Sequence, residues 1–222
     1  MDTPEILLWW ADGHAAQAYS EDRLSAGDAA RARTVRGPRA QADWRASRAL
    51  LQDVRTALAE GATTSLSHSA GHALCASGPA GLPLGADLER IRPRDVPRLA
   101  RWVCAPREQA ALARLDGAAR LERFYLLWTL KEAFVKAARL DFPADMAAVG
   151  LAGDPDADWA GWRLRAPPGA WRAAAYRLGG EWVASAVWRA AAGAPARPAW
   201  RAATNCVLPP VAILGEWEVL AD

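Results

Sequence analysis

Lysine is almost absent from this chain. Of its 27 basic residues only Lys131 and Lys136 are lysines, and arginine supplies the rest. An ammonium is a compact point charge and a guanidinium is a planar fork, so the two are not interchangeable beside a reacting phosphate. The retained pair therefore has two interpretations, a chance occurrence on a solvated helix face or a pair of functional cations. The residues around it have to decide between them.

Paired cysteines and long apolar runs are missing as well. The three cysteines, Cys75, Cys104 and Cys206, form no Cys-x-x-Cys motif, which argues against a disulfide framework and a zinc site. No apolar stretch approaches the roughly 20 residues needed to cross a bilayer. The N-terminus lacks the basic start and cleavage pattern of a signal peptide. We therefore expect a cytoplasmic protein with no membrane partner.

Charge is nearly balanced, with a formal net charge of +2 over 222 residues. So small an excess does not by itself make the chain a binder of polyanions. Arginine is nevertheless concentrated in the clusters Arg31-Arg33-Arg36-Arg39 and Arg90-Arg92-Arg94. These clusters suit solvated helix faces or a docking surface for an acidic partner, and an arginine-rich nucleic-acid-binding module is the alternative. We favour the first two and expect no nucleic acid partner.

Apolar periodicity predicts an α+β protein in two halves. In the first half we expect a strand at residues 5–10, helices over 20–58 with Ser25 as an N-cap, and short strands at 64–69 and 72–76. In the second half we expect a strand at 84–89, helices over 94–114 broken at Pro106, a long helix over 117–139, and a hairpin of 171–178 with 181–188 around Gly179-Gly180.

A turn-rich segment at 78–83 marks the boundary between the halves. We accordingly assign residues 1–82 to an N-terminal α+β half and 83–222 to a C-terminal α+β half. The tail from 195 is expected to wrap the surface, with 211–214 as an added strand or packing segment.

Two groups of charged residues share a face of their predicted element. Asp87 and Glu89 lie two apart on a strand, so both side chains point the same way. Glu132 and Lys136 follow Trp128 by four and eight residues on a helix, which places all three on one face, with Lys131 about 100° away. Alone, the first group suits a solvated turn and the second an ordinary surface ion pair.

Together these groups predict a site for magnesium and a polyphosphate. Asp87, Glu89 and Glu132 supply oxygens for a magnesium ion that takes its remaining ligands from water and phosphate. Lys131 and Lys136 would neutralise charge that develops on the phosphate oxygens. His68 and Ser67 are further phosphate-binding candidates, and Arg48 is either another or an ordinary surface arginine.

Three ordered segments resemble the signatures of the Sfp-type 4′-phosphopantetheinyl transferases. They are Ser65-Leu66-Ser67-His68-Ser69, Gly85-Ala86-Asp87-Leu88-Glu89 and Trp128-Thr129-Leu130-Lys131-Glu132-Ala133-Phe134-Val135-Lys136. The resemblance implies two similar α+β halves related by a pseudo-twofold axis, each with a small antiparallel sheet and packed helices. It also implies a cleft between them for coenzyme A and Mg²⁺.

The resemblance also assigns roles to residues. It implies that Asp87, Glu89 and Glu132 bind the metal, that Arg48 and His68, with Arg31, bind the 3′-phosphate of coenzyme A, and that Lys131 and Lys136 bind its pyrophosphate. Glu132 would in addition take the proton from the attacking serine, and Lys136 would stabilise the leaving phosphate.

The implied reaction moves the phosphopantetheine arm of coenzyme A onto a serine of an acyl or peptidyl carrier protein and releases 3′,5′-ADP. Two fused halves favour a monomer. A catalytically silent relative that only binds carriers is a further alternative, because the segment at 60–64 is shorter than is usual before the Ser-His-Ser motif.

Overall fold

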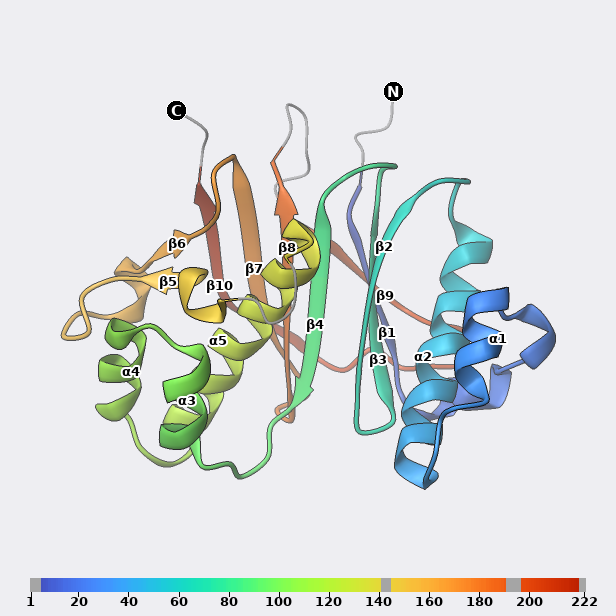
Figure 1. Ribbon diagram of the computed structural model, residues 1–222, viewed down its shortest axis with the longest axis horizontal. Coiled ribbons are helices and arrows are strands. Elements are labelled where there is room, and N and C mark those ends of the chain that lie inside the picture. The colour runs from blue at the N-terminus through green and yellow to red at the C-terminus, as the bar shows by residue number, and fades with distance from the viewer. Residues whose placement is uncertain (1–4, 141–144, 191–196, 220–222) are drawn as a thin grey trace. The chain divides into compact units, whose positions relative to one another are not determined.

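The computed structural model describes residues 5–140, 145–190 and 197–219. They fall into two compact units, unit 1 with Met1–Leu82 and Gly193–Pro209, and unit 2 with Pro83–Ala192 and Pro210–Asp222. Each unit has a four-stranded sheet and helices, as the ribbon shows (Figure 1). The predicted α+β class is confirmed. The pseudo-twofold relation between the halves stays a prediction.

Unit 1 packs a long helix on one side of its sheet. Its elements are β1 (Leu7–Ala11), 3₁₀ turns at Gly13–Ala18 and Glu21–Arg23, α1 (Ala26–Ala32), α2 (Pro38–Ala57), β2 (Thr63–Ser69), β3 (His72–Gly78) and β9 (Ala199–Ala202). The strand order is β2-β3-β1-β9. All neighbours are antiparallel except β1 and β9, which run parallel. The Ser25 hydroxyl accepts a hydrogen bond from the Asp28 backbone N–H, the predicted N-cap of α1.

Unit 2 repeats this plan with more helices. Its elements are β4 (Leu84–Arg90), α3 (Val96–Val103), α4 (Pro106–Ala113), α5 (Gly117–Ala138), β5 (Gly150–Ala152), β6 (Arg163–Arg165), β7 (Trp171–Leu178), β8 (Trp182–Arg189) and β10 (Val211–Val219), with 3₁₀ turns at Met146–Ala148 and Trp159–Gly161. The order β10-β7-β8-β4 is antiparallel throughout, and β5 pairs with β6 in a separate ribbon.

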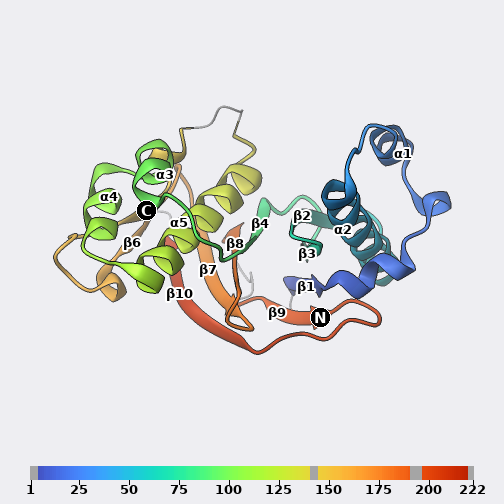
Figure 2. The same cartoon turned by 90° about the horizontal axis from the view of Figure 1, so that it is seen from below.

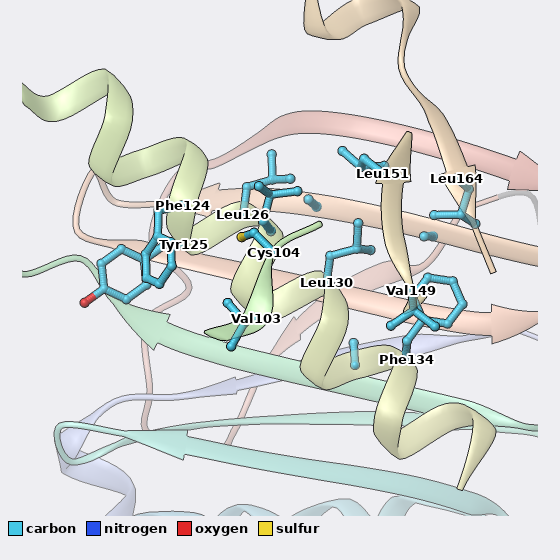
Figure 3. Close-up of a cluster of buried hydrophobic side chains, with 14 of the residues drawn as sticks. Val103, Cys104, Phe124, Tyr125, Leu126, Leu130, Phe134, Val149, Leu151 and Leu164 are labelled. Carbon is cyan, nitrogen blue, oxygen red and sulfur yellow. The ribbon is translucent and has the colours of Figure 1, made fainter. Parts of the chain in front are cut away.

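Helix α5 is the centre of unit 2. It lies between the sheet on one side and α3 and α4 on the other (Figures 1 and 2). Its apolar side chains, among them Leu126, Leu130 and Phe134, are completely or almost completely buried in the largest core cluster (Figure 3). Burial of this kind is the dominant stabilising contribution in a domain. The core therefore fixes the helix that carries Glu132 and Lys136.

The C-terminal region differs from the expectation. Residues 195–196 lie outside the described residues, but β9 joins the sheet of unit 1, and Gly193–Pro209 belongs to that unit and not to the C-terminal half. The added strand expected at 211–214 is the nine-residue β10, which pairs with β7 in unit 2. A strand parallel to β1 has no local sequence signal, because its partner lies almost 200 residues away.

Within the part of the chain that the structure describes, no helix combines the length and apolar character required to span a membrane.

Candidate active site

The side of β4 that faces α5 carries the first residues of the candidate site. A Cβ atom added to Gly85 would lie 2.0 Å from the carbonyl oxygen of Ala133 on α5, so only glycine lets the helix pack this closely. Because side chains alternate along a strand, Asp87 and Glu89 face the same side as Gly85. Asp87 is 6% exposed and Glu89 is half-buried. Gly85 is a site residue whose role the sequence analysis missed, although a glycine inside a strand is itself a signal of close backbone approach.

Lys136 bridges α5 and β4. Its ammonium lies 2.7 Å from Asp87 Oδ1 and donates a second hydrogen bond, 2.9 Å long, to the carbonyl oxygen of Ala86. The side chain is 30% exposed, against 8% for that of Asp87. The ion pair compensates a carboxylate that would otherwise be costly to bury, and it leaves part of the lysine accessible.

Glu132 lies on the same face of α5, one turn before Lys136. Its carboxyl group is half-buried. Burial raises the pKa of Glu132, the negative charge of Asp87 raises it further, and Lys136 acts in the opposite direction. Asp87, Glu132 and Lys136 therefore interact electrostatically although they come from distant parts of the sequence. Their roles in binding a metal and a phosphate stay predictions.

Thr129 and Ser185 support this arrangement from within the core. The two hydroxyl oxygens are 2.7 Å apart and both residues are fully buried. Ser185 on β8 is the cross-strand partner of Asp87 on β4. This hydrogen bond therefore fixes α5 against the strand next to the site. Trp128 is half-buried and packs against Phe124 and the core of unit 2.

Lys131 does not lie where the resemblance implied. Its side chain is fully buried and its ammonium is 2.9 Å from Glu108 Oε2 on α4. It also donates to the carbonyl oxygens of Met146, at 2.8 Å, and Val149, at 2.5 Å. Burial lowers the pKa of Lys131 and the charge of Glu108 opposes this shift. With all three donors directed at protein oxygens, the ammonium offers nothing to a pyrophosphate, so its burial conflicts with that assignment.

Glu108 is a second residue whose role the sequence analysis missed. It is fully buried and accepts hydrogen bonds from the backbone N–H groups of Ala105, at 2.7 Å, and Leu151, at 3.0 Å. A Cβ atom on Gly150, where φ is +123°, would come within 2.7 Å of both charged groups of the ion pair. The pair thus joins α4, α5 and β5 in unit 2. In sequence Glu108 looks like an ordinary acidic residue of a first helical turn, so only the fold identifies its partner.

Arg48 in unit 1 has a partner of its own. Its Nε lies 3.0 Å from Asp28 Oδ1, and its guanidinium lies over the ring of Trp44, 4.1 Å from the centroid. Burial lowers the pKa of Arg48, Asp28 opposes this, and the positive charges of Arg31 and Arg55 lower it further. The charges of Arg31 and Arg48 therefore affect each other, as expected for two residues that share a phosphate site. The Nε atom of Arg48, however, is already engaged by the carboxylate of Asp28.

His68 and Ser67 point to opposite sides of β2. Leu66 packs with α2 in the core of unit 1, so alternation places His68 on that helix-facing side and Ser67 on the other. His68 is exposed and Ser67 is 7% exposed. The sequence analysis treated the two side chains as one phosphate-binding group, which strand geometry does not allow.

The cysteines are reduced and two are inert. Burial raises the pKa of Cys75 and of Cys104 to about 12, so both thiols stay protonated at neutral pH. Across the described residues, no group of three or more His, Cys, Asp or Glu side chains is close enough, as the side chains stand, to hold a metal ion.

The segment that carries Asp87, Glu132 and Lys136 matches a known protein family. Residues 83–187, which begin where unit 2 begins and include β4, α5 and most of β8, match the model of the 4′-phosphopantetheinyl transferase superfamily. No curated protein matches the chain. The chain contains a 4′-phosphopantetheinyl transferase superfamily domain, and its general chemistry is phosphopantetheine transfer.

Proposed function

We propose that this protein is an Sfp-type enzyme that transfers the 4′-phosphopantetheine arm of coenzyme A to a serine hydroxyl of an acyl or peptidyl carrier protein. The reaction requires Mg²⁺ and releases 3′,5′-ADP. The observation that carries the proposal is the meeting of Asp87, Glu132 and Lys136 between β4 and α5, inside the segment that matches the superfamily.

The donor set fits a hard divalent cation. The negative charge of Asp87 raises the pKa of Glu132, and Glu89 faces the same side of β4 as Asp87. Oxygen donors of this kind suit magnesium, and a cation would relieve the repulsion between the carboxylates. We propose Asp87, Glu89 and Glu132 as its ligands, with small side-chain movements to gather them. The ion would supply charge neutralisation at the pyrophosphate.

The chain's own residues supply proton transfer and positioning. Glu132, whose pKa is raised, is suited to accept the proton of the serine as its oxygen attacks phosphorus. The accessible ammonium of Lys136 can move from Asp87 to a phosphate oxygen and stabilise the leaving group. Both lie on one face of a helix that Thr129 and Lys131 hold from the buried side.

The 3′-phosphate of coenzyme A is proposed to bind in unit 1. Arg48 and Arg31 supply positive charge, and the exposed imidazole of His68 supplies a further donor. The free thiols support a cytoplasmic setting. A monomer with both functions in one chain is the simplest arrangement.

The deciding experiment is intact-mass analysis of a panel of apo acyl and peptidyl carrier proteins incubated with the enzyme, coenzyme A and Mg²⁺. We expect the mass of one phosphopantetheine to be added to at least one carrier. Glu132→Gln should reduce the rate by about 10² to 10⁴, the usual contribution of a general base. Glu122→Gln is the matched control, since Glu122 is on the same helix and pairs with Arg177 at the surface.

Two outcomes would support the alternatives. Coenzyme A binding in calorimetry without any carrier modification would indicate a catalytically silent relative. Salt-sensitive duplex binding without coenzyme A binding would favour the arginine-rich nucleic-acid module. One member of the basic clusters, Arg90, is already paired with Glu181 at 3.0 Å, which weakens that module.

A further inference from the structure

Of the two lysines in the chain, both of which the structure describes, Lys136 is the accessible one. The side chain of Lys131 is fully buried in its ion pair with Glu108. The side chain of Lys136 is 30% exposed, and its ammonium binds two oxygens of β4, Asp87 Oδ1 at 2.7 Å and the carbonyl oxygen of Ala86 at 2.9 Å. The ammonium therefore occupies an oxygen of a carboxylate that we propose as a metal ligand.

A lysine ammonium and a divalent cation make competing demands on Asp87. Both are attracted to the same carboxylate, and two cations only a few ångströms apart repel each other strongly where water screens them poorly. The side chain of Asp87 is 8% exposed, so such screening is weak at this point. A metal ion that binds Asp87 must therefore displace Lys136 from the carboxylate or bear its repulsion.

The charge of Lys136 acts on Glu132 as well. Burial and the negative charge of Asp87 raise the pKa of Glu132, and Lys136 opposes them. The ammonium is thus the counter-charge for two of the three proposed metal ligands. Carboxylates that already share one cation attract a second cation less strongly, because part of their negative charge is compensated.

A pyrophosphate offers this ammonium a second partner. Lysine is a compact charge on a flexible stem, and its charge-assisted hydrogen bonds to phosphate oxygens are strong. Lys131 is not available for this role, because Glu108 and two backbone carbonyl groups hold it in the core. Movement of the Lys136 ammonium to a phosphate frees Asp87 for a metal ion and keeps the lysine compensated.

We propose that Lys136 couples the binding of the metal to the binding of coenzyme A. It holds Asp87 until the pyrophosphate draws the ammonium away, so each ligand strengthens the binding of the other. This inference rests on the proposed function for the identity of the two ligands. Because such coupling is reciprocal, loss of Lys136 changes the affinity for the metal as well as the affinity for coenzyme A. A lysine that only contacts phosphate would leave the affinity for the metal alone unchanged.

The first test measures the binding of Mn²⁺, as a probe of the magnesium site, by electron paramagnetic resonance of the unbound ion without coenzyme A. Lys136→Met should bind Mn²⁺ about tenfold or more tightly than the wild type, a factor within the usual range of coupling between sites. Arg139→Met is the matched control. It removes a positive charge from an exposed side chain at the C-cap of the same helix and should leave the affinity for Mn²⁺ almost unchanged, because solvent screens that charge.

A second measurement needs no variant and follows the wild-type ammonium directly. Because Lys131 is buried, brief acetylation with an N-hydroxysuccinimide ester and peptide mass analysis report on Lys136, with Lys131 as the internal control that stays unmodified. Saturating Mg²⁺ alone should raise the rate of Lys136 acetylation severalfold, because the ion displaces the ammonium from Asp87. Mg²⁺ together with acetyl-coenzyme A, which has no free thiol, should lower that rate again, because the phosphate then holds the ammonium.

The outcomes separate this inference from the transferase proposal. Equal Mn²⁺ affinities of the wild type and Lys136→Met, with Lys136 acetylation indifferent to Mg²⁺, would overturn the coupling, while modification of a carrier by the wild type would leave the transferase intact. Tighter Mn²⁺ binding by Lys136→Met without modification of any carrier would support the competition and refute the transferase. If neither protein binds Mn²⁺, with or without acetyl-coenzyme A, the metal site and the coupling are both refuted.

Discussion

Units 1 and 2 share one order of elements but differ in what faces the long helix. Each runs strand, helix and hairpin, and the second strand of the hairpin pairs with the first strand, giving β2-β3-β1 and β7-β8-β4. In unit 1 the helix-facing side of β1 contributes Trp9 and Ala11 to an apolar core. In unit 2 the same side of β4 carries Gly85 and Asp87. Unit 2 thus has a charged side chain where unit 1 has apolar contacts.

The two long helices show the same divergence. Each carries a tryptophan followed four residues later by a charged side chain, Trp44 with Arg48 in α2 and Trp128 with Glu132 in α5. The charge is positive in unit 1, where Asp28 compensates it, and negative in unit 2, where Lys136 does so in part. The two long helices thus present a cation in unit 1 and a carboxylate in unit 2, which agrees with the proposed anion site in unit 1 and the proposed metal site in unit 2.

The largest difference in stability between the two units is expected at the residues that precede Glu132 and Arg48, which are Lys131 in α5 and Ser47 in α2. Lys131→Met removes one partner of a fully buried ion pair and leaves Arg165, 3.6 Å away, as the remaining cation beside Glu108. Breaking a buried pair in this way typically costs about 3 to 5 kcal/mol. Ser47 holds the same place in α2, and its hydroxyl is satisfied by Trp44 O of its own helix at 2.9 Å. Ser47→Ala should cost about 1 kcal/mol. Urea denaturation of both variants measures the difference.

A double-mutant cycle sharpens this prediction. Glu108→Gln combined with Lys131→Met should destabilise less than the sum of the single changes, because the two fully buried charges of the pair are removed together. If the two effects simply add, the residues do not act as a pair.

The sequence predicted the elements well because their signals are local. Ser25 capped α1 as expected and Gly179-Gly180 joined β7 to β8, since capping and turn chemistry act over a few residues. Asp87, Glu132 and Lys136 met because a strand and a helix each have a fixed period. Lys131 was misplaced because its burial depends on Glu108, and the sequence does not show which side of α5 faces α4. The parallel pairing of β9 had no local signal either.

The next largest effect on stability is expected at Gly85, where β4 packs closely against α5. Gly85→Ala should destabilise unit 2 by about 3 kcal/mol, because the added methyl overlaps the backbone of Ala133 and α5 must move. Gly27→Ala in α1 is the matched control, since its methyl meets nothing within 4 Å and replacing a helical glycine by alanine is usually favourable. Unfolding free energies of the pair test this, and equal values would mean that α5 is not held as closely as described.

Glu132 gives unit 2 a pH dependence that Arg48 cannot give unit 1. A carboxyl group with a raised pKa in the folded state destabilises that state once ionised, so its unfavourable contribution is absent below its ordinary pKa and grows as pH rises through the raised value. Glu132→Gln should therefore raise the melting temperature at pH 7 and leave it unchanged at pH 4. Arg48→Gln should show no such crossover, because arginine stays charged over this range. A parallel pH profile for Glu132→Gln and the wild type would contradict the shift.

The smallest effect is expected at the compensated charge of unit 1. Because Asp28 already engages Nε of Arg48, only part of the guanidinium can serve a 3′-phosphate, and a shared charge contributes less than an uncompensated one. Arg48→Gln should lower the affinity for coenzyme A about tenfold, equivalent to about 1.4 kcal/mol, and leave the affinity for 3′-dephospho-coenzyme A unchanged.

Asp28→Asn is the informative counterpart to Arg48→Gln. It releases the guanidinium from its carboxylate and should strengthen binding of coenzyme A alone, so calorimetry with both ligands and both variants separates a phosphate contact from a structural role. Equal losses for the two ligands would show that Arg48 only holds α2 to α1, and unit 1 would then lack the proposed anion site.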